Sequence, residues 1–192
     1  VLQRGLRDGV LTRVRHGAYF PSTRWGGLDE LQRHVVLAQA VAASHNSRVV
    51  FSHQTAAAIQ GIDMWRPDLS RVHVTRLGPG VSGRHEAGII YHAGSLSSAD
   101  WVEYDGLPVT VPPRAAMEVA AASDIEAGLV VLDAALRIGV PFSDLARMFD
   151  DFRYVRGHNR LQLTIRLARP GTGSAGESRS RYFFWRHRIP LP

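Results

Sequence analysis

The chain has 192 residues, of which 45% are hydrophobic, so it is long enough to bury a sizeable core. It has no cysteine, and this absence excludes disulfides, thiolate metal sites and a cysteine nucleophile. No run of about eighteen apolar residues predicts a membrane span, and the N-terminus lacks the layout of a signal peptide. We therefore expect a cytoplasmic protein without a membrane partner. Its formal charge is +6, and all 23 cationic side chains are arginine.

The charge is distributed unevenly along the chain. Residues 1–24 carry +4, residues 25–152 carry −6 and residues 153–192 carry +8. Two basic ends around an acidic middle are typical of a nucleic-acid-binding protein with a separate structural or protein-binding domain, and a charge-segregated surface is the alternative. We expect three parts with these boundaries: the remnant of a DNA-binding domain, a mixed middle domain, and a basic helical tail.

The first twenty residues predict a helix followed by a hairpin. Leucines and a valine spaced four apart form one face of a helix that stops at Gly9. The segments LTRVR and AYF are expected to be strands, with His16 and Gly17 at a two-residue turn. This order is typical of the end of a winged helix-turn-helix domain, in which one helix lies in the major groove and the wing sets arginines against phosphates.

A winged domain needs two more helices before this one, and the chain opens on Val1, so we expect an upstream part. A hairpin with basic residues also occurs in many other folds. On the winged-helix interpretation the partner is double-stranded DNA, and the predicted DNA-binding residues are Arg4, Arg7, Arg13, Arg15 and His16.

The middle of the chain alternates helical and strand patterns, which predicts an α+β fold. An amphipathic helix is expected over 28–45, with Asp29 or Gly27 as its cap, and the hydroxyl of Ser52 is expected to cap the helix that runs to Gly61. Ser143 is expected to cap a later helix. The predicted strands are 49–51, 71–75, 88–92 and 107–111, and the further predicted helices are 114–122, 125–139, 142–152 and 158–168.

Two groups of residues have the types that support chemistry. Ser52 and His53 are adjacent, but neighbours at a helix start face different ways, so a helix cap is favoured over a nucleophile–base pair. His73 and His92 could meet across paired strands and bind a metal with a carboxylate such as Glu86. A cross-strand histidine pair without a metal is the preferred interpretation, and we predict neither a cofactor nor a metal.

The order of short motifs resembles a known family. The hairpin is followed by VVFSHQTAAAIQGI, VHVTR, DGLPVTVPPRAAMEVA, LVVLDAALRIG and SAGESRSRYFF. In this order the motifs resemble actinobacterial members of the AbiEi family of type IV toxin–antitoxin antitoxins, over nearly the whole chain. The resemblance implies a winged helix-turn-helix that binds the promoter of its own operon, and a middle domain that neutralises a nucleotidyltransferase-like toxin. It predicts a transcriptional autorepressor that is not an enzyme.

The last motif also looks like the start of a Vsr-like nuclease domain of the PD-(D/E)xK class, in which Glu177 would help to position metal ligands. Such a site needs further carboxylates and a lysine, and this chain has no lysine. One alternative is therefore the regulatory front part of an endonuclease whose active site lies beyond residue 192. Another is that Glu177 caps its helix or pairs with Arg181. A third interpretation of the whole chain is a protein-interaction module.

Overall fold

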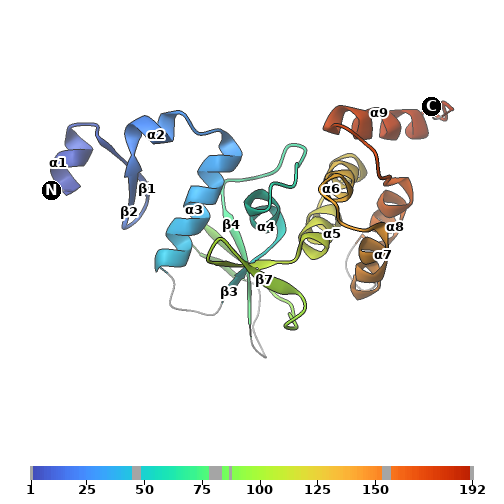
Figure 1. Ribbon diagram of the computed structural model, residues 1–192, viewed down its shortest axis with the longest axis horizontal. Coiled ribbons are helices and arrows are strands. Elements are labelled where there is room, and N and C mark those ends of the chain that lie inside the picture. The colour runs from blue at the N-terminus through green and yellow to red at the C-terminus, as the bar shows by residue number, and fades with distance from the viewer. Residues whose placement is uncertain (1, 45–48, 78–83, 87, 153–156, 191–192) are drawn as a thin grey trace.

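The computed structural model describes residues 2–44, 49–77, 84–86, 88–152 and 157–190. Within these ranges the protein has an α+β fold with a two-stranded hairpin, a six-stranded mixed sheet and packed helices, which confirms the predicted fold class. The molecule is elongated, with the hairpin at one end and the C-terminal helices at the other (Figure 1). The glycine-rich stretch 78–83 lies outside the described residues.

The N-terminal unit is a short helix followed by an antiparallel hairpin, as the glycine positions predict. Gly9 and Gly17 have φ values of 71° and 78°, the left-handed conformation that favours glycine. The strand register shifts between Arg13 and Arg15, and this bulge explains why the first strand alternates imperfectly. The elements are α1 (Leu2–Arg7), β1 (Leu11–Arg15), β2 (Ala18–Pro21) and the short α2 (Ser22–Gly26).

The central sheet has the strand order β5-β6-β4-β3-β8-β7. The pairs β3–β8 and β4–β6 are parallel, and the pairs β3–β4, β5–β6 and β7–β8 are antiparallel. The strands β5 and β7 were not predicted. Most of β7 is exposed, so it lacks an alternating buried face. The strands are β3 (Val49–Phe51), β4 (Val72–Arg76), β5 (Arg84–Glu86), β6 (Ile89–His92), β7 (Trp101–Tyr104) and β8 (Leu107–Thr110).

Three helices pack near the sheet: α3 (Glu30–Ser44), α4 (His53–Ile59) and α5 (Pro112–Ala122). Buried valines, Phe51 and Tyr91 from the sheet form one core with alanines of these helices. The helix α3 begins with a capping box, in which Gln32 N donates to Asp29 Oδ1 at 2.8 Å and Asp29 N donates to Gln32 Oε1 at 3.0 Å. Of the two predicted caps, Asp29 is therefore the one that acts.

A second core lies among the later helices: α6 (Ile125–Arg137), α7 (Phe142–Asp151), α8 (His158–Leu167) and α9 (Ala175–Arg186). Leu132 and Leu161 are fully buried in the same cluster, so the predicted basic tail is helical and shares the core of the preceding helices. The prediction for Ser143 is wrong, because α7 begins at Phe142 and its N-cap is Pro141, two residues before Ser143. No helix in the described ranges has the length and apolarity to cross a bilayer.

Candidate functional site: a histidine pocket and a basic hairpin

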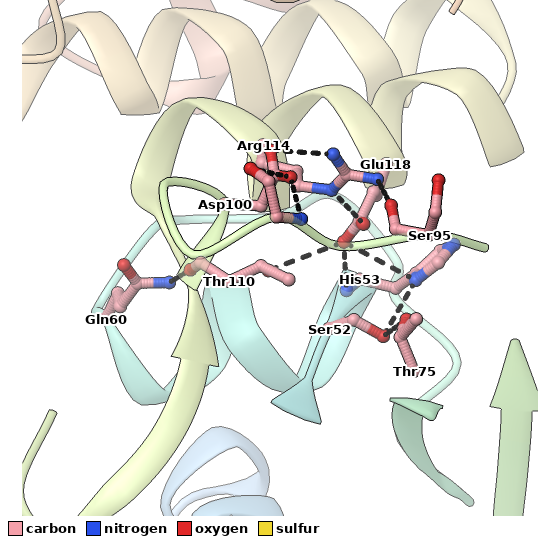
Figure 2. A network of polar contacts seen from close by, with 10 residues as sticks. Ser52, His53, Gln60, Thr75, Ser95, Asp100, Thr110, Arg114 and Glu118 are labelled. Atoms are coloured by element: carbon pink, nitrogen blue, oxygen red, sulfur yellow. Dashed lines mark hydrogen bonds and ion pairs between the residues drawn. The ribbon is translucent and has the colours of Figure 1, made fainter. Parts of the chain in front are cut away.

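A pocket of about 800 Å³ opens where β3 runs into α4 and β8 runs into α5. Because β3 and β8 are parallel neighbours, the segments that follow them emerge at the same edge of the sheet. These segments supply His53 and Arg114, and the end of β6 supplies His92. Figure 2 shows the polar network that joins His53 to the start of α5.

His53 has an unusual backbone conformation. Its φ is 53°, in the left-handed region that costs a non-glycine residue energy. Its backbone N–H donates to Glu118 Oε2 at 2.9 Å. The prediction that the Ser52 side chain caps α4 is wrong, because this hydroxyl is fully buried and accepts a hydrogen bond from Thr75 Oγ1 at 3.0 Å. A carboxylate from α5 therefore satisfies the N–H at the start of α4.

Glu118 and Arg114 lie at the centre of the network. Arg114 Nε donates to Glu118 Oε1 at 3.1 Å, and Arg114 Nη1 donates to Asp100 Oδ1 at 2.9 Å. Burial raises the pKa of Glu118 above its usual range, against hydrogen bonds from His53 and Arg114 that lower it. Burial also acts to raise the pKa of Asp100, but hydrogen bonds from Ser97 and the charge of Arg114 lower it overall. With both carboxylates ionised, this network of two acids and one guanidinium carries one negative charge.

Three histidines gather beside this network. His73 and His92 contact each other through Nδ1 and Nε2 at 2.9 Å, and the rings of His53 and His92 stack with centroids 3.5 Å apart. Burial lowers the pKa of His73 to about 3, and burial with the neighbouring histidines lowers the pKa of His53 well below 6.5. The imidazoles of His53 and His73 are therefore uncharged at neutral pH.

The predicted cross-strand pair is confirmed, since Thr75 of β4 pairs with His92 of β6 and brings His73 next to His92. The Glu86 side chain is outside the described part of the structure. Its backbone pairs with Ile89, at the opposite end of β6 from His92. The third histidine at this place is His53, which was expected at the start of a helix and was not predicted to lie beside His73 and His92.

The pocket does not have the geometry of a serine–histidine–acid triad. In a triad the serine contacts one ring nitrogen and the acid contacts the other. Here Ser52 Oγ and Glu118 Oε2 both lie near the same atom, His53 Nδ1, at 3.1 and 3.6 Å. The Ser52 side chain is also fully buried, so no substrate reaches its hydroxyl.

The basic residues predicted to contact DNA lie on α1 and the hairpin. The side chains of Arg4 and Arg7 are 82% and 79% exposed, and both lie near Asp8, at 3.4 and 3.5 Å. Arg13 on β1 and His16 at the turn are exposed as well. Arg15 differs from the others, because it is half-buried and its Nη1 has no hydrogen-bond partner within the described ranges.

At the other end of the molecule, Glu177 caps α9. Glu177 N donates to Oγ of the N-cap residue Ser174 at 3.3 Å, and Gly173 N, one residue before the N-cap, donates to Glu177 Oε2 at 2.9 Å, which is a variant of the capping box. Of the two predicted local roles, capping is confirmed, whereas Arg181 pairs with Asp133 of α6 at 2.8 Å. The nuclease resemblance also implies that Glu177 positions metal ligands, and this role stays a prediction.

No family model matches the chain, and no curated protein matches it. Among solved structures, the chain is similar to the crystal structure of the RV2827C protein from Mycobacterium tuberculosis, with 14% identity and a TM-score of 0.47 over 100% of this chain and 69% of that chain. The fold and site define an α+β protein with a basic N-terminal hairpin and an open pocket lined by histidines.

Proposed function

We propose that this protein is a DNA-binding antitoxin and transcriptional autorepressor of a type IV toxin–antitoxin operon, acting in the cytoplasm. Its cognate toxin is a nucleotidyltransferase-like protein. The observation that carries the DNA-binding part is the helix–hairpin unit at the N-terminus, which presents Arg4, Arg7 and Arg13 to solvent. The antitoxin part rests on the resemblance of the motifs to the AbiEi family.

The exposed arginines suit contact with phosphate. The ion pairs that Arg4 and Arg7 make with Asp8 lie on the surface, where such pairs contribute little, so phosphate can replace the aspartate at small cost. Each arginine that reaches a phosphate releases condensed counterions and adds salt-dependent affinity. The hairpin then serves as the wing, and α1 approaches the groove.

The basic C-terminal part is a less suitable DNA surface. Arg179 pairs with Glu126 at 2.6 Å, and Arg181 pairs with Asp133 at 2.8 Å, so acids of α6 neutralise arginines of α9. Arg179 also lies over the ring of Trp65 at 3.8 Å. These side chains hold the helix against the rest of the protein, which favours the N-terminal unit as the DNA contact.

The proposal is tested in cells with the full-length protein and its own promoter fused to a reporter. Wild-type protein is expected to repress the reporter, and the triple variant Arg4→Ala/Arg7→Ala/Arg13→Ala is expected to lose repression. The matched control is Arg147→Ala, which removes an arginine of α7 that is 76% exposed and lies outside the N-terminal unit. Repression by the triple variant equal to that of wild type would refute this DNA surface.

The antitoxin role is tested separately by co-expressing the nucleotidyltransferase gene encoded beside this one. Growth of cells that express the toxin should be restored by the wild-type protein. The DNA-binding triple variant, expressed from an unrelated promoter, should restore growth as well. Failure of the wild-type protein to restore growth would contradict the antitoxin assignment, and rescue without any repression would favour a protein-interaction module.

A further inference from the structure

We infer that His53, His73 and His92 form a binding site for a divalent transition metal such as Zn²⁺. One ligand nitrogen from each histidine lies within 4.8 Å of the other two. The inference is independent of the proposed DNA contact, which involves residues of α1 and the hairpin. It also differs from the preferred sequence interpretation, which was a histidine pair without a metal.

The distances are close to those of a tetrahedral zinc site. With Zn–N bonds of about 2.0–2.1 Å, two ligand nitrogens of such a site are about 3.3 Å apart. His73 Nδ1 and His92 Nε2 are 2.9 Å apart, so a metal ion would replace the proton between them with a small movement. The rings of His53 and His92 stack with an interplanar angle of 13°, and they must turn for their lone pairs to converge. The pocket of about 800 Å³ beside both rings provides the space.

The surroundings orient His53 as a ligand. Its Nδ1 is 3.1 Å from Ser52 Oγ and 3.6 Å from Glu118 Oε2. A proton on Nδ1 can be donated to Ser52 Oγ at 3.1 Å, and the nearby carboxylate of Glu118 favours it there, which leaves Nε2 to bind a metal. Metal-ligating histidines commonly donate their second N–H to a neighbouring oxygen in this way. Glu118 is therefore a positioning residue, which also holds the backbone of His53 through its N–H.

The donor atoms of the site favour a transition-metal cation. The carboxylates of Asp100 and Glu118 both contact the single guanidinium of Arg114, so acids surround the one arginine of this network. Imidazole ligands suit Zn²⁺, Cu²⁺ and Ni²⁺ better than Mg²⁺ or Ca²⁺, which prefer oxygen. Because His53 and His92 line the open pocket, a fourth coordination position would face solvent, as in sites that keep an exchangeable ligand.

The test uses tag-free full-length protein, dialysed against a chelator and then titrated with ZnCl₂ by calorimetry. We expect saturable binding of one ion per chain, and tetrahedral d–d absorption bands when CoCl₂ is used instead. His73→Asn and His92→Asn should each weaken Zn²⁺ binding by more than about tenfold, and Glu118→Gln should weaken it by about 10-fold to 100-fold. His187→Asn, which removes an exposed histidine after α9, is the matched control and should bind as wild type does.

Circular dichroism establishes that each variant is folded before titration. If a ligand variant does not fold, the cobalt spectrum of the wild-type protein decides the question. Bands typical of octahedral, fully hydrated cobalt would overturn the inference. So would a lack of zinc binding by the wild type, or binding that folded His73→Asn and His92→Asn variants retain unchanged.

Discussion

Glu118 provides the most informative single perturbation, because one buried carboxylate joins α5 to the start of α4. Its side chain accepts the backbone N–H of His53 at 2.9 Å and Nε of Arg114 at 3.1 Å. The substitution Glu118→Ala removes both acceptors. Arg114, whose side chain is only 14% exposed, then keeps Asp100 as its remaining carboxylate partner. The left-handed backbone of His53 also loses the contact that holds it.

Hydrogen bonds to charged groups contribute about 1.5–3 kcal/mol each, and Glu118→Ala removes two of them, whereas Arg114 keeps its pair with Asp100. We therefore expect Glu118→Ala to lower the free energy of unfolding by about 3–5 kcal/mol. The substitution Glu118→Gln keeps an oxygen that can accept one of these hydrogen bonds and loses only the charge. Its expected cost is smaller, about 1.5–3 kcal/mol, which corresponds to one charge-assisted hydrogen bond.

Urea unfolding followed by circular dichroism near neutral pH, with a chelator present, measures both values. Glu103→Ala is the control, because Glu103 is exposed on β7 and its removal should change stability by less than about 0.5 kcal/mol. Stability of Glu118→Ala within about 1 kcal/mol of wild type would refute the role given to this network. An equal loss in Glu118→Gln and Glu118→Ala would show that the charge, and not the acceptor geometry, is what matters.

Three further predictions concern stability. The folded-state pKa of His73 is about 3, below the 6.5 of the unfolded chain, so the unfolded chain takes up the proton first and stability is lost on acidification. Because of His73, the free energy of unfolding of the metal-free protein, measured with urea, should fall by about 2 kcal/mol between about pH 7 and about pH 5. In His73→Asn the free energy of unfolding should depend less on pH. A free energy of unfolding that rises on acidification would contradict this prediction. Asp133→Ala removes the buried acceptor of Arg181, so it should lower the free energy of unfolding by about 3–5 kcal/mol and speed proteolysis of α9. The control Asp144→Ala removes a surface ion pair and should lower the free energy of unfolding by less than about 1 kcal/mol. Ser174→Ala removes the side-chain cap of α9 and should cost about 1 kcal/mol in the same assay, and no change would contradict the capping box.

The helices and the hairpin were largely predictable, because their signals are local. Gly9 and Gly17 mark the left-handed positions at which the chain turns, and the periodicity of 125–139 marks a buried helix. A prediction was wrong where a side chain bonds to a residue that is distant in the sequence. Ser52 has the sequence signature of a cap, but its hydroxyl bonds to Thr75 of a neighbouring strand.

The histidine pocket could be predicted only in part, because it depends on strand order and register. The pair of His73 and His92 followed from two expected strands. His53 joins them only because β3 lies next to β4, and Glu118 reaches His53 only because β3 and β8 are parallel. Neither pairing has a signal in the sequence around these residues.

The central claim is that exposed arginines of the N-terminal unit bind DNA, and salt-dependent fluorescence anisotropy tests it most directly. The full-length protein is titrated with duplex DNA from upstream of its own operon and with a scrambled duplex, each at several salt concentrations. We predict tighter binding to the native duplex, and a salt slope that decreases by about three in Arg4→Ala/Arg7→Ala/Arg13→Ala, because each lost phosphate contact removes about 0.9. Arg147→Ala should leave the slope unchanged. Equal binding to both duplexes, or a slope that the triple variant retains, would contradict the claim.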